Sequence, residues 1–261
     1  MNRFRLCVLT LFVPGFLCAE SVFLKDGKIH SAKELRKEGN FLLFKSQGQD
    51  GTFSDTVTPL NQIERVEFGD LPALAEARQM ARQGDAVGVL EKTAAPAAFF
   101  RSFSDVPGNQ WSEVMRLRLP ALAVAGTEAT LSELQSLWTN TGDTELDTAY
   151  RLLLAAKNDP AGAHTAWKAL SQPGASSLAA GISWLELGKE ALLAKQWNTA
   201  IRAFLSVEVF VPGQRLLQPK ALLGAAEAFV RKGEKAKAAA LAEDIKTEYP
   251  TSTADASALL K

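Results

Sequence analysis

Residues 181–214 read GISWLELGKEALLAKQWNTAIRAFLSVEVFVPGQ, and they contain the clearest structural pattern in the chain. Apolar side chains recur every three or four positions, which predicts two helices over residues 179–194 and 197–210. Gly188 and Ala200 are small, so the two helices are able to cross closely at these positions. Larger side chains are expected to fill the space around the crossing: Trp184, Leu187 and Phe204.

The same pattern recurs elsewhere in the chain. It is repeated over residues 219–252, and a third copy fits residues 144–177. The prolines that end the first two of these units, Pro212 and Pro250, are 38 residues apart. This distance equals a 34-residue repeat plus four inserted residues near 214–218. Repetition in register predicts a stack of helix pairs.

The units resemble tetratricopeptide (TPR) repeats. The residues at consensus positions of the first unit are Trp184, Leu187, Gly188, Ala200, Phe204 and Pro212. Ala191 replaces the usual tyrosine and Val207 a usual alanine, and weaker copies fit residues 70–93 and 112–143. The resemblance implies a mainly α fold in which a TPR-like helical solenoid occupies residues 70–261.

The resemblance also implies a binding groove, because the first helix of each pair lines the concave face of such a solenoid. The residues expected to face the groove are Ile182, Leu185, Lys189, Leu192, Leu193, Lys220, Leu223, Glu227, Val230 and Arg231. Alternatively, several of the apolar ones only pack on adjacent helices. Glu227 and Arg231 are four positions apart, which predicts an ion pair on the helix surface. The expected occupant of the groove is a peptide or unstructured segment of another envelope protein.

Helical periodicity continues through the rest of this region. The predicted helices cover residues 72–83, 85–93, 110–125, 128–139, 144–157, 160–171, 179–194, 197–210, 217–232 and 235–248. Residues 94–109 contain Pro96, Pro107 and Gly108 and are predicted to form a loop that packs on a neighbour through its phenylalanines. Pro120 is expected to strain its helix, because proline lacks the backbone donor.

Residues 20–69 have the character of short β-strands separated by turns. The expected strands cover residues 22–24, 28–36, 41–44, 52–58 and 63–68. Turns are predicted at Asp26-Gly27 and at Gly39-Asn40. Five strands in so short a segment predict a small all-β, barrel-like module. The patterns Leu-Lys-Asp-Gly, from Leu24, and Pro-Leu-x-x-Ile-x-x-Val, from Pro59, resemble small SH3-like or Sm-like barrels of exported bacterial repeat proteins.

The charge of the chain argues against nucleic-acid binding. The 29 basic side chains are balanced by 29 acidic ones, and residues 21–69 carry seven of each. Binding to a phosphate backbone requires a positive surface, which this composition does not provide. We therefore expect a protein or peptide partner and no nucleic acid.

Residues 1–19 have the pattern of a secretory signal peptide: basic residues, an apolar run and a small residue, Ala19, before a cleavage site. Cleavage there leaves 27 basic and 29 acidic side chains and removes both cysteines, Cys7 and Cys18. The alternative is a lipoprotein attached through Cys18. No transmembrane segment is expected after removal of the signal. The expected location is the periplasm or cell envelope.

Residues with catalytic or metal-binding potential are few. His30 and His164 have no second ligand at a suitable spacing, so no metal or cofactor is expected. The acidic pairs Glu145/Asp147 and Glu243/Asp244 are most simply solvated. Four tryptophans are expected to be structural (Trp138, Trp167, Trp184 and Trp197), whereas Trp111 is open to packing or to ligand stacking.

The sequence therefore favours an exported, non-enzymatic scaffold or adaptor. The C-terminal phrase Tyr249-Pro250-x-Ser252 supports this, because it resembles the junction between TPR units in Tol-Pal-associated and outer-membrane-assembly proteins of bacteria. Two alternatives remain: an envelope enzyme or regulatory subunit that acts on cell-wall polymers, and a self-associating structural protein that forms homo-oligomers.

Overall fold

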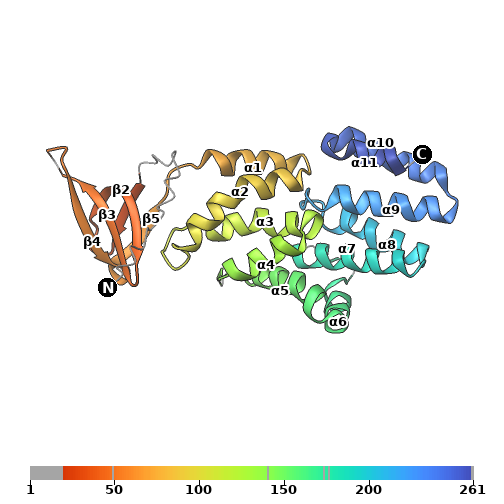
Figure 1. The fold of residues 1–261 in the computed structure, drawn as a ribbon, viewed down its shortest axis with the longest axis horizontal. Helices are drawn as coiled ribbons and strands as arrows, with labels where there is room; N and C mark the ends of the chain where they lie inside the picture. Colours follow the sequence, from red (N-terminus) through yellow and green to blue (C-terminus); the bar gives the residue numbers. More distant parts are fainter. Residues whose placement is uncertain (1–19, 49, 140, 173, 176, 260–261) are drawn as a thin grey trace, which may run out of the picture. The chain divides into compact units, whose positions relative to one another are not determined.

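The computed structural model describes residues 20–48, 50–139, 141–172, 174–175 and 177–259 (Figure 1). The predicted signal peptide, with Cys18 and the cleavage site after Ala19, lies outside these residues. The chain divides into two compact units, of which the first ends at Leu71 and the second begins at Pro72. The described residues form five strands and eleven α-helices, so the fold is mainly α as predicted.

The first unit is a five-stranded antiparallel sheet in the order β4-β3-β2-β1-β5. Its strands are β1 (Glu20–Leu24), β2 (Ile29–Glu38), β3 (Phe41–Gln47), β4 (Phe53–Pro59) and β5 (Ile63–Glu67). Both predicted turns are confirmed: Gly27 and Gly39 have φ angles of 87° and 55°. Asp26 stabilises the first turn, since its Oδ1 accepts a hydrogen bond from the amide of Lys28 at 3.0 Å.

The sheet is bent over a small apolar core. The buried apolar side chains are Val22, Ala32, Leu35, Leu42, Phe44, Ile63 and Val66. Irregularities in register between Phe23 and Leu24 and between Lys33 and Arg36 mark β-bulges, which bend strands. Pairing ends at β4 and β5, and no described pairing joins these two edges. The predicted barrel-like module is thus an open, curved sheet in its described strands.

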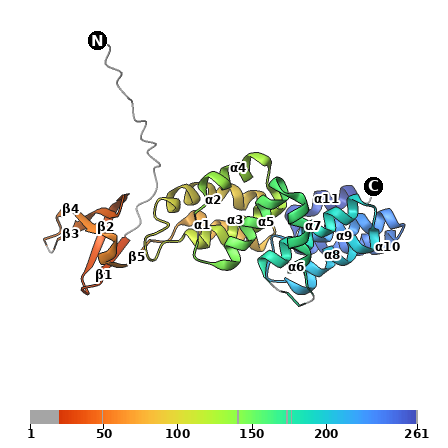
Figure 2. The same ribbon diagram turned by 90° about the horizontal axis from the view of Figure 1, so that it is seen from below.

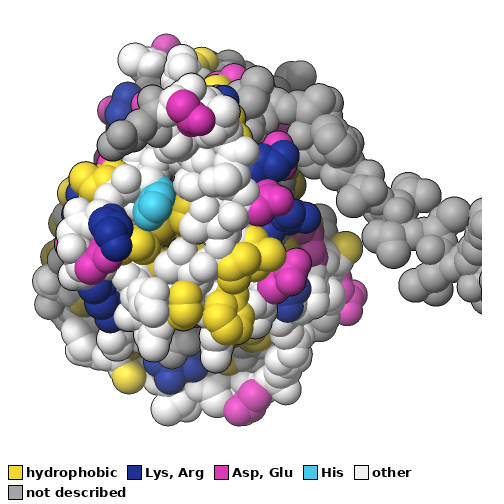
Figure 3. Space-filling model, turned by 90° about the vertical axis from the view of Figure 1, so that its left-hand side faces the viewer, with side chains coloured by type: hydrophobic (Ala, Val, Ile, Leu, Met, Phe, Trp, Pro, Cys, Tyr) yellow, Lys and Arg dark blue, Asp and Glu magenta, His cyan; other side chains and the backbone are white. Residues whose placement is uncertain are grey.

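Several apolar side chains of the sheet are exposed on its outer face. Leu43 pairs with Val57 and Phe41 with Pro59 across β3 and β4, and both Val57 and Phe41 are exposed. The ammonium of Lys33 lies 4.4 Å from the ring centroid of Phe53. Figure 3 shows apolar side chains lying beside basic and acidic ones on the face that it presents. Such mixing limits the size of any continuous apolar area.

The second unit consists of helices with short connections (Figures 1 and 2). They are α1 (Pro72–Arg82), α2 (Ala86–Arg101), α3 (Trp111–Ala125), α4 (Glu128–Leu137), α5 (Thr144–Asn158), α6 (Pro160–Leu170), α7 (Leu178–Leu193), α8 (Trp197–Phe210), α9 (Gln218–Lys232), α10 (Lys235–Glu248) and α11 (Thr253–Leu259). Five begin with a side chain that accepts from the first turn, as N-caps do: Asp85, Thr127, Asp143, Asp159 and Ser177.

The prediction of a loop over residues 94–109 is wrong in its first half. Helix α2 continues through Pro96 to Arg101, and only the residues after it form the connection to α3. A proline inside a helix costs about 3 kcal/mol. Ala97 and Phe100 are fully buried on the far side of Pro96, so their packing offsets this cost. Helix α3 likewise continues through Pro120, which is itself buried.

From α5 to α11 each helix packs on the next one, and the odd-numbered helices also contact one another in sequence. The contacts between alternate helices are α5 with α7, α7 with α9, and α9 with α11. The odd-numbered helices of this part therefore form one row, and the even-numbered helices pack beside them. Figures 1 and 2 show this side-by-side arrangement.

Phe204 of α8 fills the crossing between three helices. A Cβ atom added at Gly188 of α7 would lie 2.6 Å from its ring, and one at Gly224 of α9 would lie 2.5 Å from it. Carbon atoms do not approach so closely without displacement, so both positions require glycine. The predicted role of Gly188 is confirmed, and Gly224 has the same role against the Cε1, Cε2 and Cζ atoms of the ring.

The inserted residues near 214–218 contact the beginning of the helical unit. Leu216 is buried in a cluster with Val89 of α2 and Ala121 of α3. The guanidinium of Arg215 donates to the carbonyl oxygen of Arg82 at 3.4 Å and pairs with Glu248 at 3.1 Å. In a simple linear array each repeat contacts only its neighbours. Here the α8–α9 connection joins the first helices of the unit to the last ones.

The tryptophans are mostly structural. Trp111 is fully buried, and its indole Nε1 donates to the carbonyl oxygen of Thr139 at 3.2 Å. Trp138, which follows α4, stacks on Tyr150 with ring centroids 3.8 Å apart. Trp167 is buried among α5, α6 and α7. The open question about Trp111 is thus answered in favour of packing.

We expect Glu208→Gln to raise Tm at pH 7 by about 1–3 °C. Glu208 is an exposed residue, yet partial desolvation, together with the carboxylates of Asp244 and Glu248, raises the pKa of its carboxyl above the usual value. Folding therefore favours the protonated side chain, and its contribution to stability is lost as pH rises through the folded-state pKa. Thermal melts at pH 7 and pH 3.5 test this, since the difference should vanish at the lower pH. A control is Glu243→Gln, because Glu243 is paired with Lys246.

Candidate functional site

A groove of about 650 Å³ runs along the row of odd-numbered helices. It is lined by side chains of α3, α7, α9 and α11, with Phe204 of α8 at its base. Six of the residues predicted to face a groove line it: Lys189, Leu192, Leu193, Lys220, Leu223 and Glu227. Leu193 is 84% exposed. Helices α7 and α9, which occupy corresponding positions in the two clearest repeat units, thus line the same groove.

The other predicted residues lie elsewhere. Ile182 and Leu185 have no exposed surface and belong to the core of the helical unit, as the packing alternative stated. Both lie in the first half of α7, a helix that packs against α5, α6, α8 and α9. Val230 and Arg231 are outside the groove lining. The guanidinium of Arg231 lies 3.5 Å from Glu227, which confirms the predicted ion pair.

Besides Phe204 and Gly224 at the α8–α9 contact, three lining residues were not predicted from the sequence to face a groove: Val124 of α3, and Asp255 and Leu259 of α11. These three come from α3 and α11, whose match to the repeat pattern is weak or incomplete. Asp255 offered a signal, since it stands where the resembling junctions have alanine. Asp255 is exposed at the wall of the groove, so its carboxylate remains solvated there.

The groove has an apolar floor and charged side chains above it. The ammonium of Lys189 pairs with Glu186 at 2.7 Å and donates to the carbonyl oxygen of Ala123 at 3.4 Å. Among the described residues, the side chains of Lys220 and Asp255 have neither an ion-pair nor a hydrogen-bond partner. One cation and one anion are therefore available to a ligand.

The groove continues along α9 into a smaller hollow of about 220 Å³. The two share Val124, Lys220, Leu223 and Asp255, and the hollow extends to Gly84 at the α1–α2 turn. Gly84 approaches α9 closely, since a Cβ atom there would lie 2.7 Å from the ring of Pro219. The joining of the first and last helices thus lengthens the concave surface.

Of the two acidic pairs expected to be solvated, Glu243 and Asp244 are exposed, whereas Glu145 and Asp147 accept hydrogen bonds that hold the structure. Glu145 accepts a hydrogen bond from the amide of Leu178 at 2.5 Å, and Asp147 accepts one from the hydroxyl of Thr141 at 3.0 Å. Within the described part of the chain, no group of three or more His, Cys, Asp or Glu side chains is arranged to hold a metal ion. Nor is any described helix both long and apolar enough to cross a bilayer.

Comparison with known proteins supplies no family or relative from which a role for the groove could be taken. The chain matches no protein-family model, and no significant similarity is found to a curated protein or to a solved structure.

Proposed function

We propose that the chain is an exported, non-enzymatic scaffold of the TPR type, which binds a segment of a protein partner in the groove formed by α3, α7, α9 and α11. One observation carries the proposal: residues predicted from two sequence repeats to face a partner line the same concavity. The amino-terminal pattern of residues 1–19 supports export.

The lining of the groove indicates the chemistry of its occupant. Leu192, Leu193 and Leu223 offer an apolar surface, which favours a segment with leucine-sized side chains. Lys220 suits an acidic residue of that segment and Asp255 a basic one, since both lack partners among the described residues. A volume of about 650 Å³ is in the range of binding sites for small ligands or a few side chains.

Site-specific photo-crosslinking tests the proposal. A photoreactive residue at position 223, in the groove, is compared with one at position 209, since Val209 is 66% exposed on α8 and does not line the groove. In native cells we expect position 223 to crosslink to one defined segment of a partner and position 209 not to do so. The crosslinked peptide is then identified by mass spectrometry.

The outcomes separate the candidate functions. A crosslinked segment from this same chain would favour self-association. Equal, diffuse labelling at positions 223 and 209 would contradict a specific groove. A single foreign segment with an acidic residue and leucine-sized side chains supports the scaffold.

A further inference from the structure

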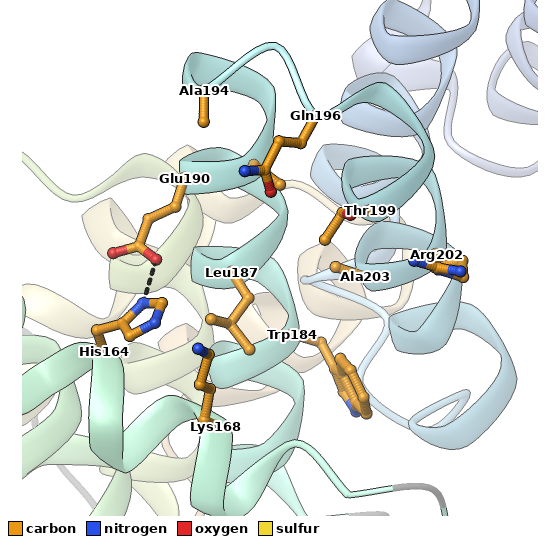
Figure 4. A pocket seen from close by; sticks show the side chains of 11 residues that line it. His164, Lys168, Trp184, Leu187, Glu190, Ala194, Gln196, Thr199, Arg202 and Ala203 are labelled. Atoms are coloured by element: carbon orange, nitrogen blue, oxygen red, sulfur yellow. Dashed lines mark hydrogen bonds and ion pairs between the residues drawn. The ribbon is translucent and has the colours of Figure 1, made fainter.

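A separate hollow, of about 530 Å³, lies between α6, α7 and α8 (Figure 4). We call it the Ala191 pocket; its lining includes His164, Lys168, Leu187, Ala191, Arg202 and Ala203. It shares no lining residue with the groove described above. It therefore requires an explanation of its own.

The repeat explains why this hollow exists. Position 191 corresponds to Phe229 in the unit that begins 38 residues later. Phe229 is half-buried there, with the ammonium of Lys237 5.5 Å from its ring centroid. At position 191 the side chain is only a methyl group, and the neighbouring Ala194 and Ala203 are equally small. The Ala191 pocket is thus the space of a missing aromatic side chain.

The walls of the pocket carry an excess of unpaired positive charge. Its one carboxylate, that of Glu190, is bound by the imidazole Nδ1 of His164 at 2.6 Å. Lys168 of α6 and Arg202 of α8 both line the pocket, and neither side chain has a partner among the described residues. Figure 4 shows Lys168 extending toward Leu187 at the floor. An apolar floor below two free cations suits an anion attached to an apolar group.

We propose that the Ala191 pocket binds a peptide segment in which an aromatic side chain adjoins a carboxylate, as at an aromatic C-terminus. The aromatic ring occupies the space that Phe229 fills in the following unit. The carboxylate lies between Lys168 and Arg202. Trp184, held by stacking on Phe210 with centroids 6.3 Å apart, forms an apolar part of the wall.

The test measures binding of two peptides to the full chain by calorimetry. One is Gly-Gly-Gly-Phe with a free carboxylate, and the other is the same peptide with an amidated C-terminus. We expect the free acid to bind at least tenfold more tightly. Lys168→Gln and Arg202→Gln should each weaken it about tenfold, whereas Lys235→Gln, an exposed lysine that does not line the pocket, should leave binding unchanged.

Ala191→Phe supplies the decisive variant, because it restores the aromatic side chain of the corresponding position. It should abolish binding of the free acid while far-ultraviolet circular dichroism and Tm remain close to those of the parent. Equal binding of the acid and the amide, or undiminished binding by Ala191→Phe, would overturn the proposal. If Ala191→Phe unfolds, the charge variants decide: their binding with parental affinity would also overturn it.

Discussion

We expect Phe204→Ala to lower the free energy of unfolding of the helical unit by about 3–5 kcal/mol. Phe204 is 2% exposed, and its ring is in contact with the backbones of α7 at Gly188 and α9 at Gly224. Its removal leaves a cavity that the surrounding backbone cannot collapse to fill. Urea denaturation followed by circular dichroism gives the loss directly.

A matched control and a double-mutant cycle identify the cause. Val209→Ala, on the exposed side of the same helix, should cost less than about 0.5 kcal/mol. Gly224→Ala should destabilise the parent, because a methyl group there meets the ring of Phe204. In the background of Phe204→Leu the same change should be neutral or stabilising, since alanine is favoured in helices by about 1 kcal/mol. Destabilisation of equal size in both backgrounds would contradict the contact.

The second large effect is expected at the α8–α9 connection. Leu216→Ala should cost about 2–4 kcal/mol, because Leu216 is 4% exposed and packs against α2 and α3. The loss should also be local, since Leu216 joins the first helices of the unit to the last. The substitution should therefore increase the rate of amide hydrogen exchange more in α1 and α2 than in α5 and α6.

A leucine of contrasting environment provides the control for this prediction. Leu193→Ala removes the same atoms from a side chain that is 84% exposed, so its effect on unfolding should stay below about 0.5 kcal/mol. Leu216→Ala with unchanged exchange in α1 and α2 would show that the connection does not join the two ends.

The elements of the fold were largely predictable because they rest on local patterns. The five strands were predicted from short strand-like runs separated by turns, two of them at Gly27 and Gly39, and most helices from their apolar period. Helix α2 was cut short because Pro96 is a local signal against helix. Its continuation depends on burial of Ala97 and Phe100, which is decided by helices distant in sequence.

The site was predictable only in part, for the same reason. The repeat frame identified Lys189, Leu192, Lys220 and others on α7 and α9. The contributions of α3 and α11 depend on how the ends of the unit meet, through the insertion that carries Leu216. The spacing of the repeats shows that residues are inserted near 214–218, but it does not show what these residues contact. Likewise, the sequence showed only that Ala191 replaces the tyrosine usual in TPR repeats, and the pocket beside it was not predicted.

The central claim is that the groove along the odd-numbered helices binds a partner segment. The most direct test is the affinity of the crosslinked segment, as a synthetic peptide, for the parent, Lys220→Glu and Lys235→Glu. The claim predicts about tenfold weaker binding by Lys220→Glu, restored when the acidic residue of the peptide is changed to lysine, and parental binding by Lys235→Glu. Equal affinity of all three proteins for the original peptide would contradict it.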